Sequence, residues 1–157
     1  MGRRDHYYAA GAPRANSIVV AVTAVVRGGA GRLLLQRRAD NGLWALPGGA
    51  QDVGEYVAET VVREVREETG IEVEVVGLVG VYSDPNHVVE FDDGEVRQQF
   101  SLCFRARPVG GRLAVSAEST DVRWVDPADL DSYDIHPSMR LRIEHGLDDG
   151  RAGPYLG

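Results

Sequence analysis

The residues from Gly48 to Ile71 constrain this chain more than any other stretch. A glycine turn opens it, and a predicted helix follows that crowds five glutamates and two arginines into a few turns. Glu64, Glu67 and Glu68 stand at i, i+3 and i+4, so they share one helix face. Like charges at this spacing destabilise a helix, and folding alone gives no reason for them. A bound hard cation does give one, because Mg²⁺ takes carboxylate oxygens.

The apolar side of this helix predicts where it packs. Ala58, Val61, Val62 and Val65 recur at helical spacing and form one stripe that we expect to lie on a sheet. The glutamate face would then lie beside the stripe, at the edge of the core. Gly70 suits the left-handed position that ends a helix. Gly54, or Asp52 with Glu55 three residues on, is the predicted cap at the start.

A salt-bridged surface helix is the simpler alternative, and only the full spacing decides against it. That spacing reads Gly49, five residues, Glu55, seven residues, Arg63-Glu64-Val65, one residue, Glu67-Glu68, one residue, Gly70-Ile71. It matches every fixed position of the Nudix box, so the chain resembles the Nudix hydrolase family. The preceding run, Leu43 to Gly48, is also similar to the family's usual approach to the box. Within the box, one flexible position departs from the family's pattern: Thr60 stands where alanine is common.

The resemblance implies hydrolysis of a nucleoside diphosphate linked to another group X, with Mg²⁺ or Mn²⁺. By resemblance, Glu64, Glu67, Glu68 and the carbonyl of Gly48 hold the metal, and Arg63 orients a glutamate. Glu64 or Glu67 is the predicted general base, because a carboxylate near the attacking water can take its proton. Some relatives place the base in a downstream loop, where this chain has Glu118, although a turn cap is the simpler reading of that residue.

The substrate is predicted from residues outside the box. The run Ser83-Asp84-Pro85, with His87 nearby, is similar to Nudix proteins that hydrolyse ADP-ribose, although a turn proline explains it equally well. A nucleoside-diphosphate sugar such as ADP-ribose is therefore the first prediction. The alternatives are a MutT-like nucleoside triphosphate pyrophosphohydrolase and a non-catalytic nucleotide-binding module. Further candidates for contacting base, ribose or phosphate are Trp44, Tyr82, Phe91, Phe100, Trp124, Arg37, Arg97 and Gln99.

Composition limits the partners and the cellular compartment that we expect for this chain. A formal net charge of −7 argues against long nucleic acids as partners, although metal ions can reverse the local field at one acidic site. No apolar run is long enough for a membrane span and no leader precedes the domain, so we expect a cytoplasmic protein. The lone Cys103 lies in an apolar run and is predicted to be a buried thiol. By analogy with the family, a homodimer is favoured.

The order of predicted elements indicates a single α/β domain, an α/β/α sandwich around a mixed β-sheet, as in the Nudix fold. We place this domain at residues 17–145, after an arm (1–16) without regular structure and before a loose tail (146–157). A loop or an irregular hairpin, with its turn at Asp92-Asp93-Gly94, is expected over 83–95. A helix is expected to start at Pro127, with Asp126 as its cap. A final helix is expected over 137–145. Predicted strands cover 17–26, 32–38, 44–46, 72–82, 97–107, 113–115 and 121–125.

Overall fold

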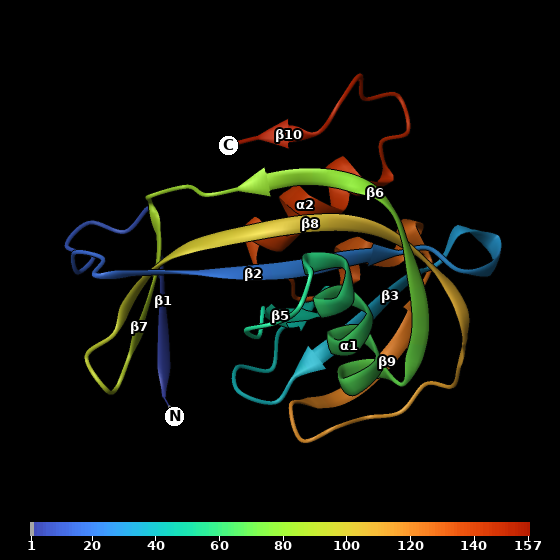
Figure 1. Cartoon of the computed structure of the whole chain (residues 1–157), viewed down its shortest axis with the longest axis horizontal. Coiled ribbons are helices and arrows are strands. Elements are labelled where there is room, and N and C mark those ends of the chain that lie inside the picture. Colours follow the sequence, from blue (N-terminus) through green and yellow to red (C-terminus); the bar gives the residue numbers. More distant parts are fainter. Residues whose placement is uncertain (1) are drawn as a thin grey trace.

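The computed structural model describes residues 2–157, which form a seven-stranded and a three-stranded β-sheet with two α-helices (Figure 1). The strands of the larger sheet are β1 (Arg3–Tyr7), β2 (Ser17–Val26), β5 (Gly48–Ala50), β6 (Ile71–Tyr82), β7 (His87–Phe91), β8 (Val96–Gly111) and β10 (Tyr155–Leu156). The smaller sheet contains β3 (Leu33–Arg38), β4 (Trp44–Ala45) and β9 (Ser119–Val125). The helices are α1 (Val57–Thr69) and α2 (Pro137–Leu147), with short 3₁₀ turns at Gly29–Gly31 and Pro127–Ser132.

The long strand β8 organises the larger sheet. It pairs in parallel with β2 along ten residues, and antiparallel with β6 and β7. The mixed sheet was predicted, and so was an irregularity at Gly77, where the β6–β8 register shifts between Val75 and Gly77.

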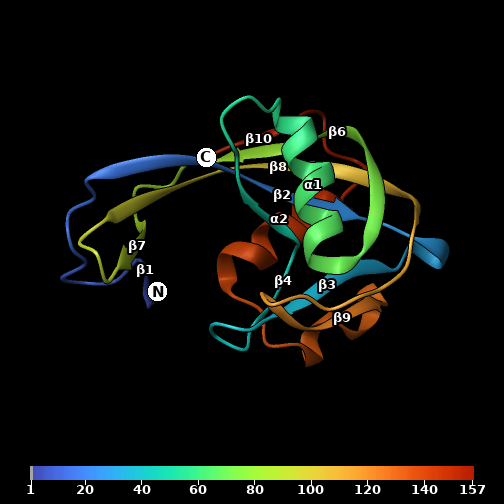
Figure 2. The same ribbon diagram turned by 60° about the horizontal axis from the view of Figure 1, so that its bottom comes forward.

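Two cores lie on opposite faces of the strands, because neighbouring strand residues point to opposite sides. Val22, Ala24 and Val26 of β2 pack with α1, whereas Val25 packs with Ile143 of α2. Figure 1 shows α1 in front of the strands and α2 behind them, and the turned view in Figure 2 keeps α1 in front. The predicted α/β/α arrangement is therefore confirmed. Cys103 is fully buried in the core next to α2, as predicted.

Helix α1 ends as predicted and starts differently. Gly70 caps its C-terminus in the left-handed conformation, with φ of 78°. The predicted caps at Gly54 or Asp52 are wrong, because Tyr56 is the N-cap and makes no side-chain cap bond. Glu55 instead accepts hydrogen bonds from the backbone N–H of Asp52 and the hydroxyl of Thr60.

The buried face of α1 is rotated from the predicted stripe. Val61 and Val65 are fully buried as expected, but Ala58 is exposed and Thr60 and Glu68 are buried. The glutamates therefore do not share one environment at the core's edge: Glu68 lies within the packed face, and Glu67 lies outside it.

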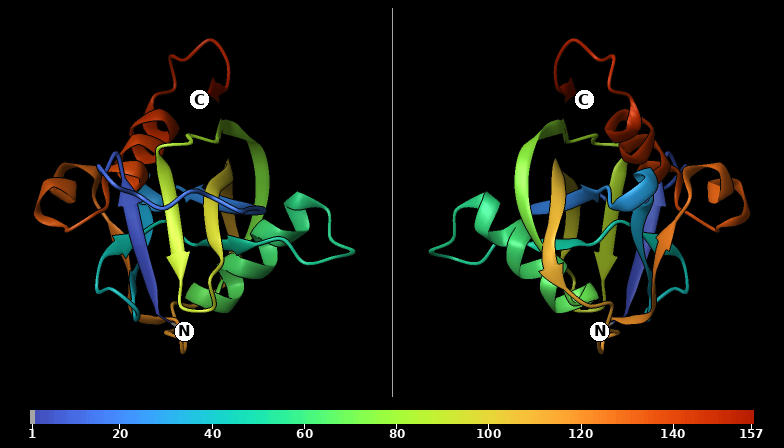
Figure 3. Two further views of the ribbon diagram at one scale, coloured as in Figure 1. Left: turned by 90° about the vertical axis from the view of Figure 1, so that its left-hand side faces the viewer. Right: turned by 90° about the vertical axis from the view of Figure 1, so that its right-hand side faces the viewer.

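Three predictions about irregular segments are wrong. Strand β1 lies in the predicted arm and pairs antiparallel with β7 (Figure 3). Strand β7 forms an antiparallel hairpin with β8 that turns at Asp92-Asp93-Gly94, so the hairpin alternative for residues 83–95 is correct. The tail contributes β10, which runs parallel to β6. Residues 113–115 form no strand. At 127–132 the chain forms a 3₁₀ turn, and the carboxylate of Asp126 accepts the N–H of Ala128, so the predicted cap is correct.

Candidate active site

The glycine turn at β5 fits closely against two neighbours. A Cβ at Gly48 would lie 2.1 Å from the carbonyl oxygen of Val22, in the adjoining strand β2. A Cβ at Gly49 would lie 2.5 Å from Cδ of Glu64. Only glycine lets the turn approach both the sheet and the helix this closely.

Glu68 is held under this turn by two hydrogen bonds. Its side chain accepts the backbone N–H of Gly48 at 2.8 Å and the side-chain amide of Gln36 at 2.6 Å. Burial raises the pKa of Glu68 to about 7, against the opposing effect of the Gln36 and Gly48 hydrogen bonds. The protein therefore holds a carboxylate whose negative charge is only partly compensated.

Arg63 lies among the other acidic side chains of the helix and turn. Its guanidinium donates to Glu55 at 2.7 and 2.9 Å, to Glu64 at 2.8 Å and to Glu67 at 3.3 Å. It also donates to the carbonyl of Ala50 at 3.1 Å, which ties helix α1 to the glycine turn. The bond from Arg63 lowers the pKa of Glu55 to about 2. Burial raises the pKa of Glu64 although Arg63 opposes the shift.

A cavity of about 700 Å³ opens beside this arrangement. Gly48, Gly49, Ala50, Glu68 and Glu118 are among the residues that line it, whereas the predicted site residues Glu64 and Glu67 are not. Glu118 raises the pKa of both Glu64 and Glu68 through its charge, as a lesser cause after burial. The volume suits a nucleotide-sized ligand.

The acidic residues fit a divalent cation in their chemistry and only partly in their positions. The pKa values of Glu64 and Glu68 are raised, so little positive charge from the protein compensates these two carboxylates. Oxygen donors of this kind suit Mg²⁺ or Mn²⁺. Across residues 2–157, however, no three His, Cys, Asp or Glu side chains gather closely enough to hold a metal ion. Arg63 draws Glu64 and Glu67 to itself, and the Glu67 side chain is 57% exposed.

The cavity collects some of the candidate substrate contacts and not others. Trp44, Phe91, Arg97 and Gln99 line it. Tyr82 instead packs in the core, where its hydroxyl bonds to Nδ1 of His145. The remaining candidates, Arg37, Phe100 and Trp124, lie outside its lining. Asp84 accepts hydrogen bonds from the hydroxyl of Tyr8 and the backbone N–H of Asn86. These bonds agree with a turn at residues 83–87, the alternative to a role in substrate binding.

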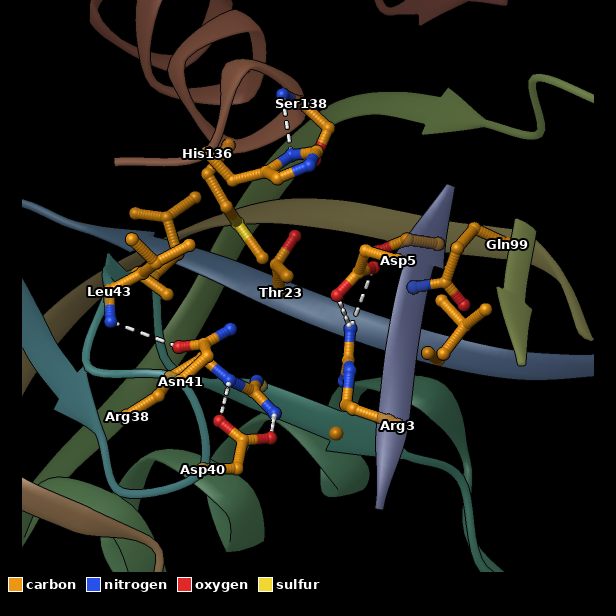
Figure 4. A pocket seen from close by; sticks show the side chains of 18 of the residues that line it. Arg3, Asp5, Thr23, Arg38, Asp40, Asn41, Leu43, Gln99, His136 and Ser138 are labelled. Carbon is orange, nitrogen blue, oxygen red and sulfur yellow. Dashed lines mark hydrogen bonds and ion pairs between the residues drawn. The ribbon is translucent and has the colours of Figure 1, made fainter. Parts of the chain in front are cut away.

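Several cavity residues had no support in the sequence analysis. Strand β1 supplies Arg3 and Asp5, and the start of α2 supplies His136 and Ser138 (Figure 4). Arg142, from the middle of the same helix, also lines the cavity. The alternation of Arg3, Asp5 and Tyr7 is a strand pattern, but it is too short and polar to outweigh the flanking glycines and proline. In α2, spacing shows that Ser138 and Arg142 share a face, but not that this face meets a cavity.

Comparison with known proteins assigns the family. The NUDIX domain model matches residues 18–145. The chain belongs to the Nudix family. Nudix hydrolases generally use divalent metal ions. This agrees with the oxygen donors of the acidic wall, by which we mean Glu68 and Glu118 in the cavity lining together with Glu64 behind Gly49.

Named relatives agree on the reaction class and differ in substrate. The chain is 41% identical over 137 residues to a MutT-like protein of Streptomyces ambofaciens, covering 87% of this chain and 80% of the relative. It is 34% identical to an ADP-ribose pyrophosphatase of Methanocaldococcus jannaschii, covering 73% of this chain and 61% of that protein. It is 30% identical to the nucleoside triphosphatase NudI of Escherichia coli, covering 72% and 86%. These relatives identify the chain as a Nudix pyrophosphohydrolase.

The fold agrees with solved structures. A NUDIX hydrolase from Nitrosomonas europaea superposes with a TM-score of 0.73 at 23% identity, over 90% of this chain and 78% of that one. No helix within residues 2–157 has the length and apolar character needed to cross a membrane.

Proposed function

We propose that this enzyme hydrolyses the pyrophosphate bond of a nucleoside-diphosphate sugar such as ADP-ribose, with Mg²⁺ or Mn²⁺. The observation that carries the proposal is the acidic group at the edge of the cavity. Glu68 lines the cavity beneath Gly48, and Glu64 lies behind the lining residue Gly49. A pyrophosphate is itself anionic, so such a group of carboxylates can bind it only together with cations.

Gly48, Glu64, Glu67 and Glu68 are the residues that would hold the metal. When bound, the metal neutralises phosphate oxygens and lowers the pKa of the attacking water. The chain's own groups do the remaining work. Arg63 fixes the Glu64 carboxylate through a charge-assisted hydrogen bond of 2.8 Å and couples it to the turn through Ala50.

Glu64 is the leading candidate for the general base, with Glu67 as the second. Burial raises the pKa of Glu64, which makes its carboxylate a better proton acceptor near neutral pH. Glu118 is a third candidate because it lies on the cavity wall, whereas Glu64 and Glu67 belong to the box. Substitution of each by Gln separates these three roles.

Two observations support ADP-ribose, and one supports the runner-up. The cavity of about 700 Å³ has room for a nucleotide with an attached sugar, and a relative at 34% identity is named an ADP-ribose pyrophosphatase. The relative named a nucleoside triphosphatase favours a nucleoside triphosphate instead.

The homodimer favoured by family analogy stays a prediction, which light scattering of the purified protein tests.

A substrate panel tests the proposal. Purified protein is incubated with Mg²⁺ or Mn²⁺ and ADP-ribose, other nucleotide sugars, dinucleoside polyphosphates or nucleoside triphosphates. We expect AMP and ribose 5-phosphate from ADP-ribose at the highest kcat/KM. Release of pyrophosphate from a nucleoside triphosphate at a higher kcat/KM would establish the runner-up, and no product from any substrate would contradict both.

A further inference from the structure

The arginines that line the cavity are ion-paired, with one exception within residues 2–157. Three of the four lining arginines form ion pairs, namely Arg3 with Asp5 at 3.0 Å, Arg38 with Asp40 at 2.7 Å and Arg97 with Glu95 at 2.7 Å. Figure 4 shows the first two pairs facing the cavity. The fourth, Arg142 of α2, forms no ion pair with any residue in the described range 2–157.

Arg142 is also deeply buried, at 4% exposure. Its Nη1 donates to the carbonyl of Ser138 at 2.7 Å, and its guanidinium carbon lies 4.5 Å from the centre of the Tyr82 ring. Its Nε has no hydrogen-bond partner. A ring face and one carbonyl compensate a guanidinium only partly, and an unpaired buried charge is costly. The fold therefore keeps a buried cation that its own carboxylates do not neutralise.

Two hydroxyls near this layer of the molecule lack strong partners as well. Oγ of Ser101 is buried without a hydrogen bond, and Oγ1 of Thr23 has no partner other than the weak thiol of Cys103 on the neighbouring strand. Both residues line the cavity. They point to the α2 side of the sheet, because Val25 and Cys103, two positions further along the same strands, pack in the α2 core. Glu68 belongs to the opposite helix. The unpaired cation and the acidic wall therefore come from opposite layers around one cavity.

The other titratable side chains near the cavity do not neutralise Arg142. The Asp5 carboxylate is engaged by Arg3 and lies 3.3 Å from Nε2 of His87. His136 uses its Nδ1 to accept the N–H of Ser138 at the start of α2. What is left over is donor-rich: one guanidinium N–H and two hydroxyls. Such a set fits a group that carries only acceptors and a negative charge.

We propose that Arg142, with Thr23 and Ser101, forms a binding site for a phosphate group, separate from the acidic wall that would hold metal and pyrophosphate. The inference deepens the proposed function, on which it rests for the identity of the pyrophosphate end. The phosphate comes either from a substrate that carries a further phosphate besides its pyrophosphate, such as ADP-ribose with a 2′-phosphate on the adenosine, or from free inorganic phosphate. Both sources present the same anionic oxygens to Arg142.

The first experiment needs no turnover, so its outcome does not depend on the proposed function. The melting temperature is measured in EDTA with increasing inorganic phosphate, against sodium chloride of equal ionic strength. We expect phosphate to raise the melting temperature of the native protein and of Arg140→Met, and not of Arg142→Met. Arg140 is the matched control, because it lies in α2, binds carbonyls of Leu130 and Tyr133, and does not line the cavity.

Ser101→Ala and Thr23→Val keep the inference testable if Arg142→Met does not fold, because each removes one hydroxyl and little volume. Each should weaken the apparent phosphate affinity about tenfold, the loss expected for one hydrogen bond to a charged group. Equal phosphate effects in the native protein and all three variants would overturn the inference, as would a native protein that phosphate does not stabilise.

The second experiment identifies the source of the phosphate. It compares kcat/KM for ADP-ribose and for the same molecule with a 2′-phosphate on the adenosine. A preference for the phosphorylated substrate that disappears in Arg142→Met assigns the site to the substrate. Equal kcat/KM values, together with phosphate stabilisation that requires Arg142, assign it to free phosphate.

Discussion

Substitution of the two adjacent glycines by alanine should have opposite consequences. An ordinary Cβ contact needs about 3.4 Å, whereas a Cβ at Gly49 would lie 2.5 Å from Cδ of Glu64. The carboxylate is the end of a flexible side chain, so it can retreat by about 1 Å while the backbone stays in place. A misplacement of this size at a reacting centre costs about 100-fold in rate. Gly49→Ala should therefore lose most of kcat/KM and less than about 1 kcal/mol of stability.

Gly48 gives the matched contrast. Its Cβ would meet the backbone oxygen of Val22 at 2.1 Å, and a strand backbone cannot rotate aside. Gly48→Ala should therefore cost about 1–3 kcal/mol, in the range of an overpacked core. That loss corresponds to a melting temperature lower by roughly 3–10 °C for a chain of this size.

Both variants are assayed in parallel, by thermal unfolding and by metal-dependent hydrolysis of the preferred substrate. Native kcat/KM in Gly49→Ala would refute the placement of Glu64 against the turn. An unchanged melting temperature in Gly48→Ala would refute the close contact between β5 and β2.

Three further predictions concern stability. Val65→Ala, at a fully buried position of α1, should lower the free energy of unfolding by about 2 kcal/mol and the melting temperature by roughly 4–8 °C; a neutral effect would contradict the packing of α1 on the sheet. Burial raises the pKa of Asp5, but the bonds to His87 and Arg3 outweigh it and hold the pKa well below its usual range. The stabilisation by the ionised Asp5 carboxylate is complete above about pH 4, and it is lost as the pH falls towards the lower pKa of the folded state. The free energy of unfolding in urea is therefore compared between the native protein and Asp5→Asn. The difference should be constant from pH 7 to 5 and shrink below pH 4. Mn²⁺ at about 100 times its dissociation constant should stabilise the native protein by about 2.7 kcal/mol, reversibly with EDTA, and an equal effect on a Glu64→Gln, Glu68→Gln double variant would place the metal elsewhere.

Local sequence signals predicted the elements that local interactions determine. Gly70 ends α1 because glycine adopts the left-handed conformation at little cost, and that preference is visible in the sequence. The strands at 17–26 and 72–82 are rich in β-branched residues and were located within a residue or so. The spacing of the box also located the glutamates on α1, although their roles stay a prediction.

Contacts between distant segments account for what the sequence did not reveal. Glu68 can be buried because Gln36 and the N–H of Gly48 bind it, and neither is its neighbour in the chain. Strand β1 is polar and short, and it is ordered by pairing with β7, eighty or more residues away. The burial of Arg142 depends on how α2 packs, which helical spacing does not specify.

The most direct test of the central claim is ADP-ribose hydrolysis by Glu64→Gln, measured beside Glu59→Gln. Glu59 is the matched control, because it is exposed in the first turn of the same helix. With Mg²⁺, we predict AMP and ribose 5-phosphate from the native protein and Glu59→Gln at similar rates, and a kcat lower by at least about 100-fold in Glu64→Gln. Full activity in Glu64→Gln, or native activity that persists in EDTA, would contradict the account.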